Sequence, residues 1–148
     1  MFFYNFSYSL PTFMVLILVL VGCSAAPNLP PVSGQLMLDG KAVTTNETKK
    51  ATINYHPDVS KGNTANSIAV ASATETGQYT LSYNGKPGIP EGWYKVTVNY
   101  SEPLNPKDPY SVPKQLISEK YNTVEKTQLS VEVKANAPAS NYELKVTK

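Results

Sequence analysis

The clearest structural signal in the chain is Tyr94-Lys95-Val96-Thr97-Val98-Asn99-Tyr100, in which large apolar side chains alternate with polar ones. A period of two places alternate side chains on opposite faces of a β-strand. The stretch therefore predicts a strand whose Tyr94, Val96, Val98 and Tyr100 side chains face a hydrophobic core.

The same alternation recurs from Val32 onward, and turn signals such as Asp39-Gly40 and Thr74-Glu75-Thr76-Gly77 separate the segments. Short alternating strands of this kind predict an all-β sandwich of two antiparallel sheets with about seven strands. Most of the aromatic positions are tyrosines, which we expect to place their rings in the core and their hydroxyls near its rim. The expected inward residues are Val32, Leu36, Leu38, Ala51, Ile53, Tyr55, Ile68, Val70, Tyr79, Leu81, Tyr83, Leu129, Val131, Val133, Tyr142, Leu144 and Val146.

Before this domain, an apolar run from Phe13 to Val21 ends at Leu20-Val21-Gly22-Cys23. The run is shorter than the roughly 20 residues of a membrane span and suits the core of a signal peptide. The small-residue site before the only cysteine resembles the lipobox of bacterial lipoproteins. Unlike most export signals, however, residues 1–12 contain no lysine or arginine.

The lipobox resemblance implies that residues 1–22 are removed and that Cys23 carries lipid on its sulfur. Residues 23–31 would then be the lipidated cysteine and a proline-rich tether, and residues 32–148 the sandwich. Two or more acyl chains hold a protein persistently on a membrane, so we expect a periplasmic or extracellular domain anchored by lipid. The same resemblance implies that, in a host with two membranes, Ser24 in place of an aspartate after the cysteine favours the outer membrane. The alternative is that Cys23 is an unmodified, buried thiol.

Composition argues against a nucleic-acid partner. The 148 residues carry 13 basic and 11 acidic side chains, a net charge of +2, and every basic residue is a lysine. Arginine is the residue best suited to bind phosphates and base edges through two parallel hydrogen bonds. The lysines, for their part, do not cluster into a stripe along the sequence.

Three segments carry a family resemblance, namely residues 34–41, 76–81 and 89–98. They resemble the carboxypeptidase regulatory-like domain, and the similarity extends over residues 32–146. Residues 116–122 and 129–133 are similar to small secreted lipoproteins of this group in planctomycete-type bacteria. The resemblance implies a transthyretin-like sandwich that supports other functions and does not catalyse; another immunoglobulin-like sandwich is the alternative fold.

The residue inventory also predicts no enzyme, no metal and no cofactor. His56 is the only histidine, and no strand-turn-helix elbow surrounds any serine. His56 and Asp58 could offer two metal ligands, whereas zinc sites use three or four. An envelope hydrolase that depends on His56 is the remaining catalytic alternative.

Two loops, residues 84–92 and 101–113, are the candidate contact surfaces, because long loops rich in glycine or proline often bind partners. Trp93 lies on the face of its strand opposite Tyr94, and Tyr110 lies within the second loop. We expect a structural or protein-interaction module of the envelope. The alternatives are a carbohydrate- or peptide-binding module with Trp93 and Tyr110 as ligand contacts, or loops that only cap the core.

Overall fold

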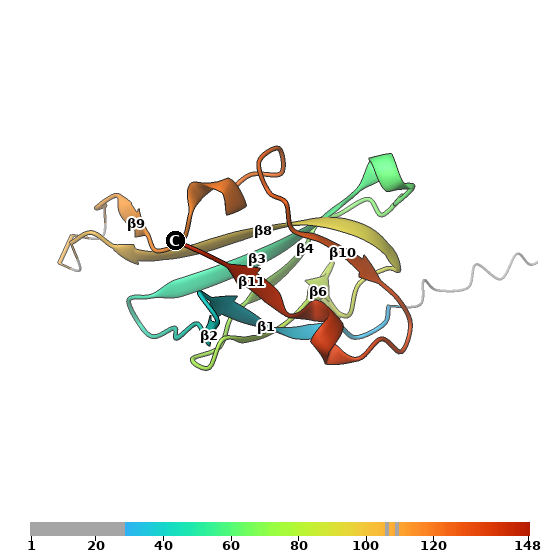
Figure 1. Ribbon diagram of the computed structural model, residues 1–148, viewed down its shortest axis with the longest axis horizontal. Helices are drawn as coiled ribbons and strands as arrows, with labels where there is room; N and C mark the ends of the chain where they lie inside the picture. Colours follow the sequence, from blue (N-terminus) through green and yellow to red (C-terminus); the bar gives the residue numbers. More distant parts are fainter. Residues whose placement is uncertain (1–28, 106, 109) are drawn as a thin grey trace, which may run out of the picture.

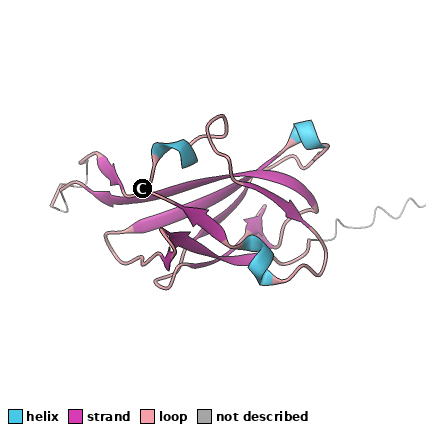
Figure 2. Ribbon diagram, viewed as in Figure 1, coloured by secondary structure: helices cyan, strands magenta, loops and turns pink. Residues whose placement is uncertain are grey.

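The computed structural model describes residues 29–105, 107–108 and 110–148; across these residues it contains two β-sheets and no α-helix (Figures 1 and 2). The expected signal peptide and Cys23 lie outside the described residues. Three short 3₁₀ helices are η1 (Val59–Lys61), η2 (Glu119–Tyr121) and η3 (Ala139–Tyr142). The strands are β1 (Ser33–Leu38), β2 (Lys41–Ala42), β3 (Lys50–Pro57), β4 (Ala69–Ser72), β5 (Gln78–Thr80), β6 (Ser82–Tyr83), β7 (Lys86–Pro87), β8 (Gly92–Pro103), β9 (Pro113–Gln115), β10 (Ser130–Val133) and β11 (Leu144–Val146).

The larger sheet has the order β10-β8-β3-β4-β6-β7, and β9 pairs with the end of β8. Its centre is the antiparallel pair β3 and β8, which runs over eight residue pairs. In this pair Ile53 lies opposite Val98 and Tyr55 opposite Val96, and all four side chains are buried. The strand predicted from the alternation between Tyr94 and Tyr100 is therefore confirmed.

The smaller sheet is built around β1, which pairs with β11 along one edge and with β2 and β5 along the other. Leu36 of β1 lies opposite Leu144 of β11, and this pairing is parallel. The expectation of purely antiparallel sheets is wrong at this pair. The reason is the connection from β10 through η3, which carries the chain from the larger sheet to the start of β1. From there β11 runs in the same direction as β1, alongside its second half, Leu36–Leu38.

The expected strand from Tyr79 to Tyr83 is divided at Leu81. The Leu81 amide donates to the carbonyl of Val32 (2.9 Å), and its carbonyl accepts from the amide of Gly88 (3.1 Å). As a result β5 pairs with β1 in the smaller sheet, whereas β6 pairs with β4 in the larger one. This break and the additional short strands β2, β7 and β9 give eleven strands within the described residues, in place of about seven.

The two sheets enclose one hydrophobic core, an arrangement consistent with a β-sandwich. The tyrosines expected in the core are buried, among them Tyr142, which lies in η3 and not in a strand. On β4 the expectation is wrong in detail, because Ala69 and Ala71 face the core while Ile68 and Val70 stay 46% and 43% exposed. The alanines lie opposite Tyr55 and Ile53 of β3, so small side chains leave room for large neighbours. Leu38, Leu129 and Val131 are only partly buried against the core.

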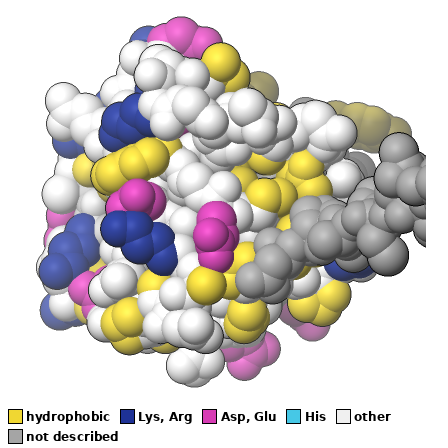
Figure 3. All heavy atoms as spheres, turned by 90° about the vertical axis from the view of Figure 1, so that its right-hand side faces the viewer, with side chains coloured by type: hydrophobic (Ala, Val, Ile, Leu, Met, Phe, Trp, Pro, Cys, Tyr) yellow, Lys and Arg dark blue, Asp and Glu magenta, His cyan; other side chains and the backbone are white. Residues whose placement is uncertain are grey.

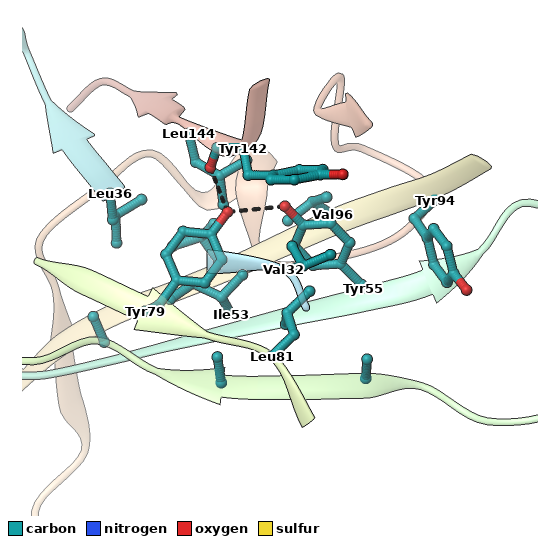
Figure 4. Close-up of a cluster of buried hydrophobic side chains, with 14 of the residues drawn as sticks. Val32, Leu36, Ile53, Tyr55, Tyr79, Leu81, Tyr94, Val96, Tyr142 and Leu144 are labelled. Atoms are coloured by element: carbon teal, nitrogen blue, oxygen red, sulfur yellow. Dashed lines mark hydrogen bonds between the residues drawn. The ribbon is translucent and has the colours of Figure 1, made fainter. Parts of the chain in front are cut away.

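Three tyrosines form a buried hydrogen-bonded chain between the sheets (Figure 4). The Tyr79 hydroxyl donates to the carbonyl of Tyr142 (2.5 Å) and lies 2.9 Å from the Tyr55 hydroxyl. Because the Tyr79 proton is used on the carbonyl, Tyr55 is the donor to Tyr79. Burial, more than any other cause, raises the pKa of both hydroxyls. Gly34 makes room for this chain, since a Cβ there would lie 2.1 Å from the Tyr142 carbonyl oxygen.

Replacing Tyr79→Phe should lower the free energy of unfolding by about 1–3 kcal/mol, because it leaves a buried carbonyl and a buried hydroxyl without a partner. The matched control is Tyr110→Phe, whose side chain is 93% exposed and whose loss of a hydroxyl should change the stability by less than about 0.5 kcal/mol. Urea unfolding measures the free energy of unfolding of both variants. Equal unfolding midpoints for the two variants would contradict a stabilising role for the tyrosine hydrogen bonds.

Candidate functional site

The two candidate loops lie at opposite ends of the sandwich, because β8 joins them. Both expected loops are shorter than predicted, because β8 includes Gly92 and residues 101–103 and β9 begins at Pro113. Residues 84–91 precede β8 and residues 104–112 follow it, and the 12 residues of this strand span about 36 Å. The first described residues pack at the former end, where the Ile89 amide donates to the carbonyl of Pro30 (3.2 Å). We call this the Leu29 end and the other the Tyr110 end (Figure 1).

The structure therefore does not bring the two expected ligand contacts together. Trp93 is the second residue of β8, at the Leu29 end, whereas Tyr110 lies in the loop beyond the last residue of that strand. A ligand the size of a few sugar rings cannot touch both side chains across the length of β8. The two residues belong to separate candidate surfaces.

Trp93 is partly buried on the outer face of the larger sheet and carries a lysine over its ring. The Lys61 ammonium lies 3.9 Å from the ring centroid and donates to the Ser130 hydroxyl at 2.9 Å. A cation over an aromatic face is attracted by the electron density of the ring. Lys61 thus covers a ring face on which a sugar could otherwise stack. The sequence pattern does not predict this contact between η1 and β8.

The loop that carries Lys61 is held by two buried polar residues, Asp58 and Asn63. The carbonyl of Trp93 accepts from the Asp58 amide (2.9 Å) and from the Asn63 side-chain amide (2.7 Å). The Asp58 carboxylate accepts from the Ser60 hydroxyl at 2.6 Å, and this hydrogen bond is the main reason that the pKa of Asp58 is lowered. Asp58, one of the two residues that could offer a metal ligand, therefore organises a turn.

A surface hollow of about 490 Å³ lies beside this loop. Its lining residues include Lys61, Asn66, Asn84 and Glu91, which carry an ammonium, two side-chain amides and a carboxylate. Three of these residues already have partners within the protein: Lys61 donates to Ser130, Asn66 accepts from the Tyr83 hydroxyl (2.6 Å), and Glu91 accepts from the Ala135 amide (2.9 Å). Such a mixture of donors and acceptors suits a polar ligand that bears hydroxyl or amide groups.

His56 lies on the outer face of the larger sheet and bonds to a neighbouring strand. Its Nε2 is 3.0 Å from the hydroxyl oxygen of Thr97, which is buried and also accepts from the Asn54 amide (3.4 Å). Burial lowers the pKa of His56, and the nearby Glu125 opposes this shift. Within the described residues, no group of three or more His, Cys, Asp or Glu side chains is placed to hold a metal ion.

The Tyr110 end presents apolar side chains to solvent. Tyr110 is 93%, Val112 76% and Leu104 69% exposed. The loop that carries them contains local turns, in which Asp108 accepts from the Tyr110 amide (2.9 Å) and Ser111 donates to the Asn105 carbonyl (3.1 Å). Exposed apolar side chains gathered in one loop are typical of a contact surface.

Neither a protein-family model, nor a curated protein, nor a solved structure matches this chain. In the part of the chain that the structure describes, no helix is both long and apolar enough to cross a membrane.

Replacing Lys61→Ala should uncover the Trp93 ring, because the ammonium that lies over it is removed. We expect stronger quenching of the tryptophan emission by acrylamide and a loss of about 0.5–1 kcal/mol of stability. Lys86→Ala, at an exposed position of the same end, is the control and should leave the quenching unchanged. If both variants quench as the parent protein does, the ammonium does not shield the ring in solution.

Proposed function

We propose that this chain is a lipid-anchored, non-catalytic module of the bacterial envelope that binds a protein partner through its Tyr110 end. One observation carries the proposal: the chain enters the sandwich at the end opposite the exposed side chains of Leu104, Tyr110 and Val112. An anchor at Cys23 would then hold the Leu29 end near the membrane. The Tyr110 end would face away from it, toward other envelope proteins.

The turns of the domain support the proposed carboxypeptidase regulatory-like, transthyretin-like type of sandwich. Asp39 and Gly40 both have positive φ (49° and 80°) in the hairpin between β1 and β2, and Gly77 has a φ of 79° just before β5. A left-handed conformation at these positions explains why the quoted segments contain Asp-Gly and Thr-Gly. The resemblance thus includes residues that adopt the left-handed turn conformations of this fold.

The surroundings of His56 support a function without catalysis. The imidazole is bonded to a buried threonine hydroxyl, and both lie between strands on a sheet face. A nucleophile must reach a substrate in a cleft, whereas Thr97 is only 4% exposed. We therefore assign the bond between His56 and Thr97 to packing of the sheet.

Binding of a glycan or peptide at the Leu29 end is the second candidate function. The hollow beside Asn66, Asn84 and Glu91 favours it, because these side chains offer the hydrogen bonds that a polar ligand needs. Its ligand would bind within reach of the membrane surface.

Replacing Cys23→Ala should release the protein from membranes, because no acyl chain can then be attached. Fractionation of cells that express the parent protein and the variant measures this release, and circular dichroism of the variant verifies its fold. A Ser24→Ala variant keeps the sulfur and should stay with the membranes. The anchor is disproved if the Cys23→Ala protein sediments as firmly as its parent.

A photo-crosslinking amino acid at position 110 should capture a protein partner in intact cells, because the Tyr110 end is the proposed contact surface. The same amino acid at position 80, an exposed residue of the smaller sheet, serves as the control. It should not capture any protein that is captured from position 110. Specific capture from position 84 and not from position 110 would favour the second candidate function and contradict the first.

A further inference from the structure

We propose that the Leu29 end is a docking surface for the lipid headgroup layer, with Val59, Lys61 and Trp93 at the contact. This inference rests on the proposed lipid anchor at Cys23. It adds that the domain has a defined orientation at the membrane and is not merely tethered near it.

The first argument is the length of chain between the anchor and the sandwich. Six residue steps separate Cys23 from Leu29. A fully extended chain rises at most about 3.6 Å per residue, so the Cα atom of Leu29 lies within about 22 Å of the Cα atom of Cys23. This is shorter than the roughly 36 Å of β8, so the Tyr110 end cannot rest on the membrane without laying the whole sandwich on its side.

The second argument is the chemistry of the side chains at this end. Val59, at the start of η1, is 79% exposed, and two residues later Lys61 reaches over the Trp93 ring. Tryptophan rings favour the membrane interface, where one part is apolar and the other hydrated. Lysine adapts to the same place, because its long stem lies on apolar surface while its charge reaches the headgroups.

The third argument concerns charge. Figure 3 looks onto the face at the right-hand side of Figure 1, where lysine, acidic and apolar side chains are intermingled. Glu132, which lies opposite Trp93 in the pairing of β10 with β8, forms an ion pair with Lys134 at 2.6 Å, so charges of both signs lie beside the tryptophan. The contact therefore depends on the tether and on interfacial side chains, and we expect it on uncharged as well as on anionic membranes.

The test uses the full lipidated protein bound to phosphatidylcholine vesicles, a fraction of whose headgroups carry a nitroxide quencher. Trp93 is the only tryptophan in the sequence and reports the Leu29 end. We expect the nitroxide to lower its emission about two-fold, since the ring lies at the level of the headgroups. The matched control is the double variant Trp93→Phe/Tyr110→Trp, whose single tryptophan reports the other end and should keep its emission.

A second variant, Val59→Asp, adds a charge at the exposed tip and should reduce the quenching of Trp93 while the protein still sediments with the vesicles. Sedimentation is measured first in every case. Failure of the parent protein to sediment contradicts the anchor, and with it the docking surface. Sedimentation without quenching of Trp93, or with equal quenching at positions 93 and 110, leaves the anchor intact and overturns the docking surface.

Discussion

The chain of hydrogen bonds from Tyr55 through Tyr79 to the Tyr142 carbonyl is the contact on which the arrangement of the two sheets depends. It joins β3 of the larger sheet to β5 of the smaller one and to η3. Apolar side chains can pack in several ways, but a buried hydroxyl or carbonyl without a partner costs free energy. These tyrosine hydrogen bonds therefore favour one relative position of the two sheets. Gly34, which has no side chain, leaves the space that the Tyr142 carbonyl occupies in this position.

That position also determines what lies at each end. The start of β1 lies beside Tyr142, and the residues just before β1 pack against residues 88–89. The long strand β8 then leads away from this end, so that the loop of Tyr110 lies at the opposite end. The entry point of the chain and the exposed apolar loop are thus separated by the length of the domain. With the anchor that we propose near the amino terminus, this separation would place one end of the domain toward the membrane and the other toward a partner.

The surface around Trp93 is organised mainly through backbone groups. Asp58 and Asn63 both bond to the Trp93 carbonyl, and this places the Lys61 ammonium over the ring. The sequence alone allows His56 and Asp58 to be metal ligands, because both side chains can bind metals. In the structure these groups are used internally, by Thr97 and by the turn at Ser60. Polar residues at the end of a strand fit either role until their partners are known.

Alternation along the sequence was enough to predict the strands at β3 and β8 and the inward direction of Ile53 and Val96, because the period of two is a local property of an extended backbone. It could not predict the parallel pairing of β1 with β11, the division at Leu81, or the inward alanines of β4. Those features, like the distance between Trp93 and Tyr110 and the approach of Lys61 to the ring, depend on pairing between residues far apart in the chain. Which distant residue a given residue pairs with is decided by the packing of the two sheets around the whole core. A local sequence pattern does not contain this information.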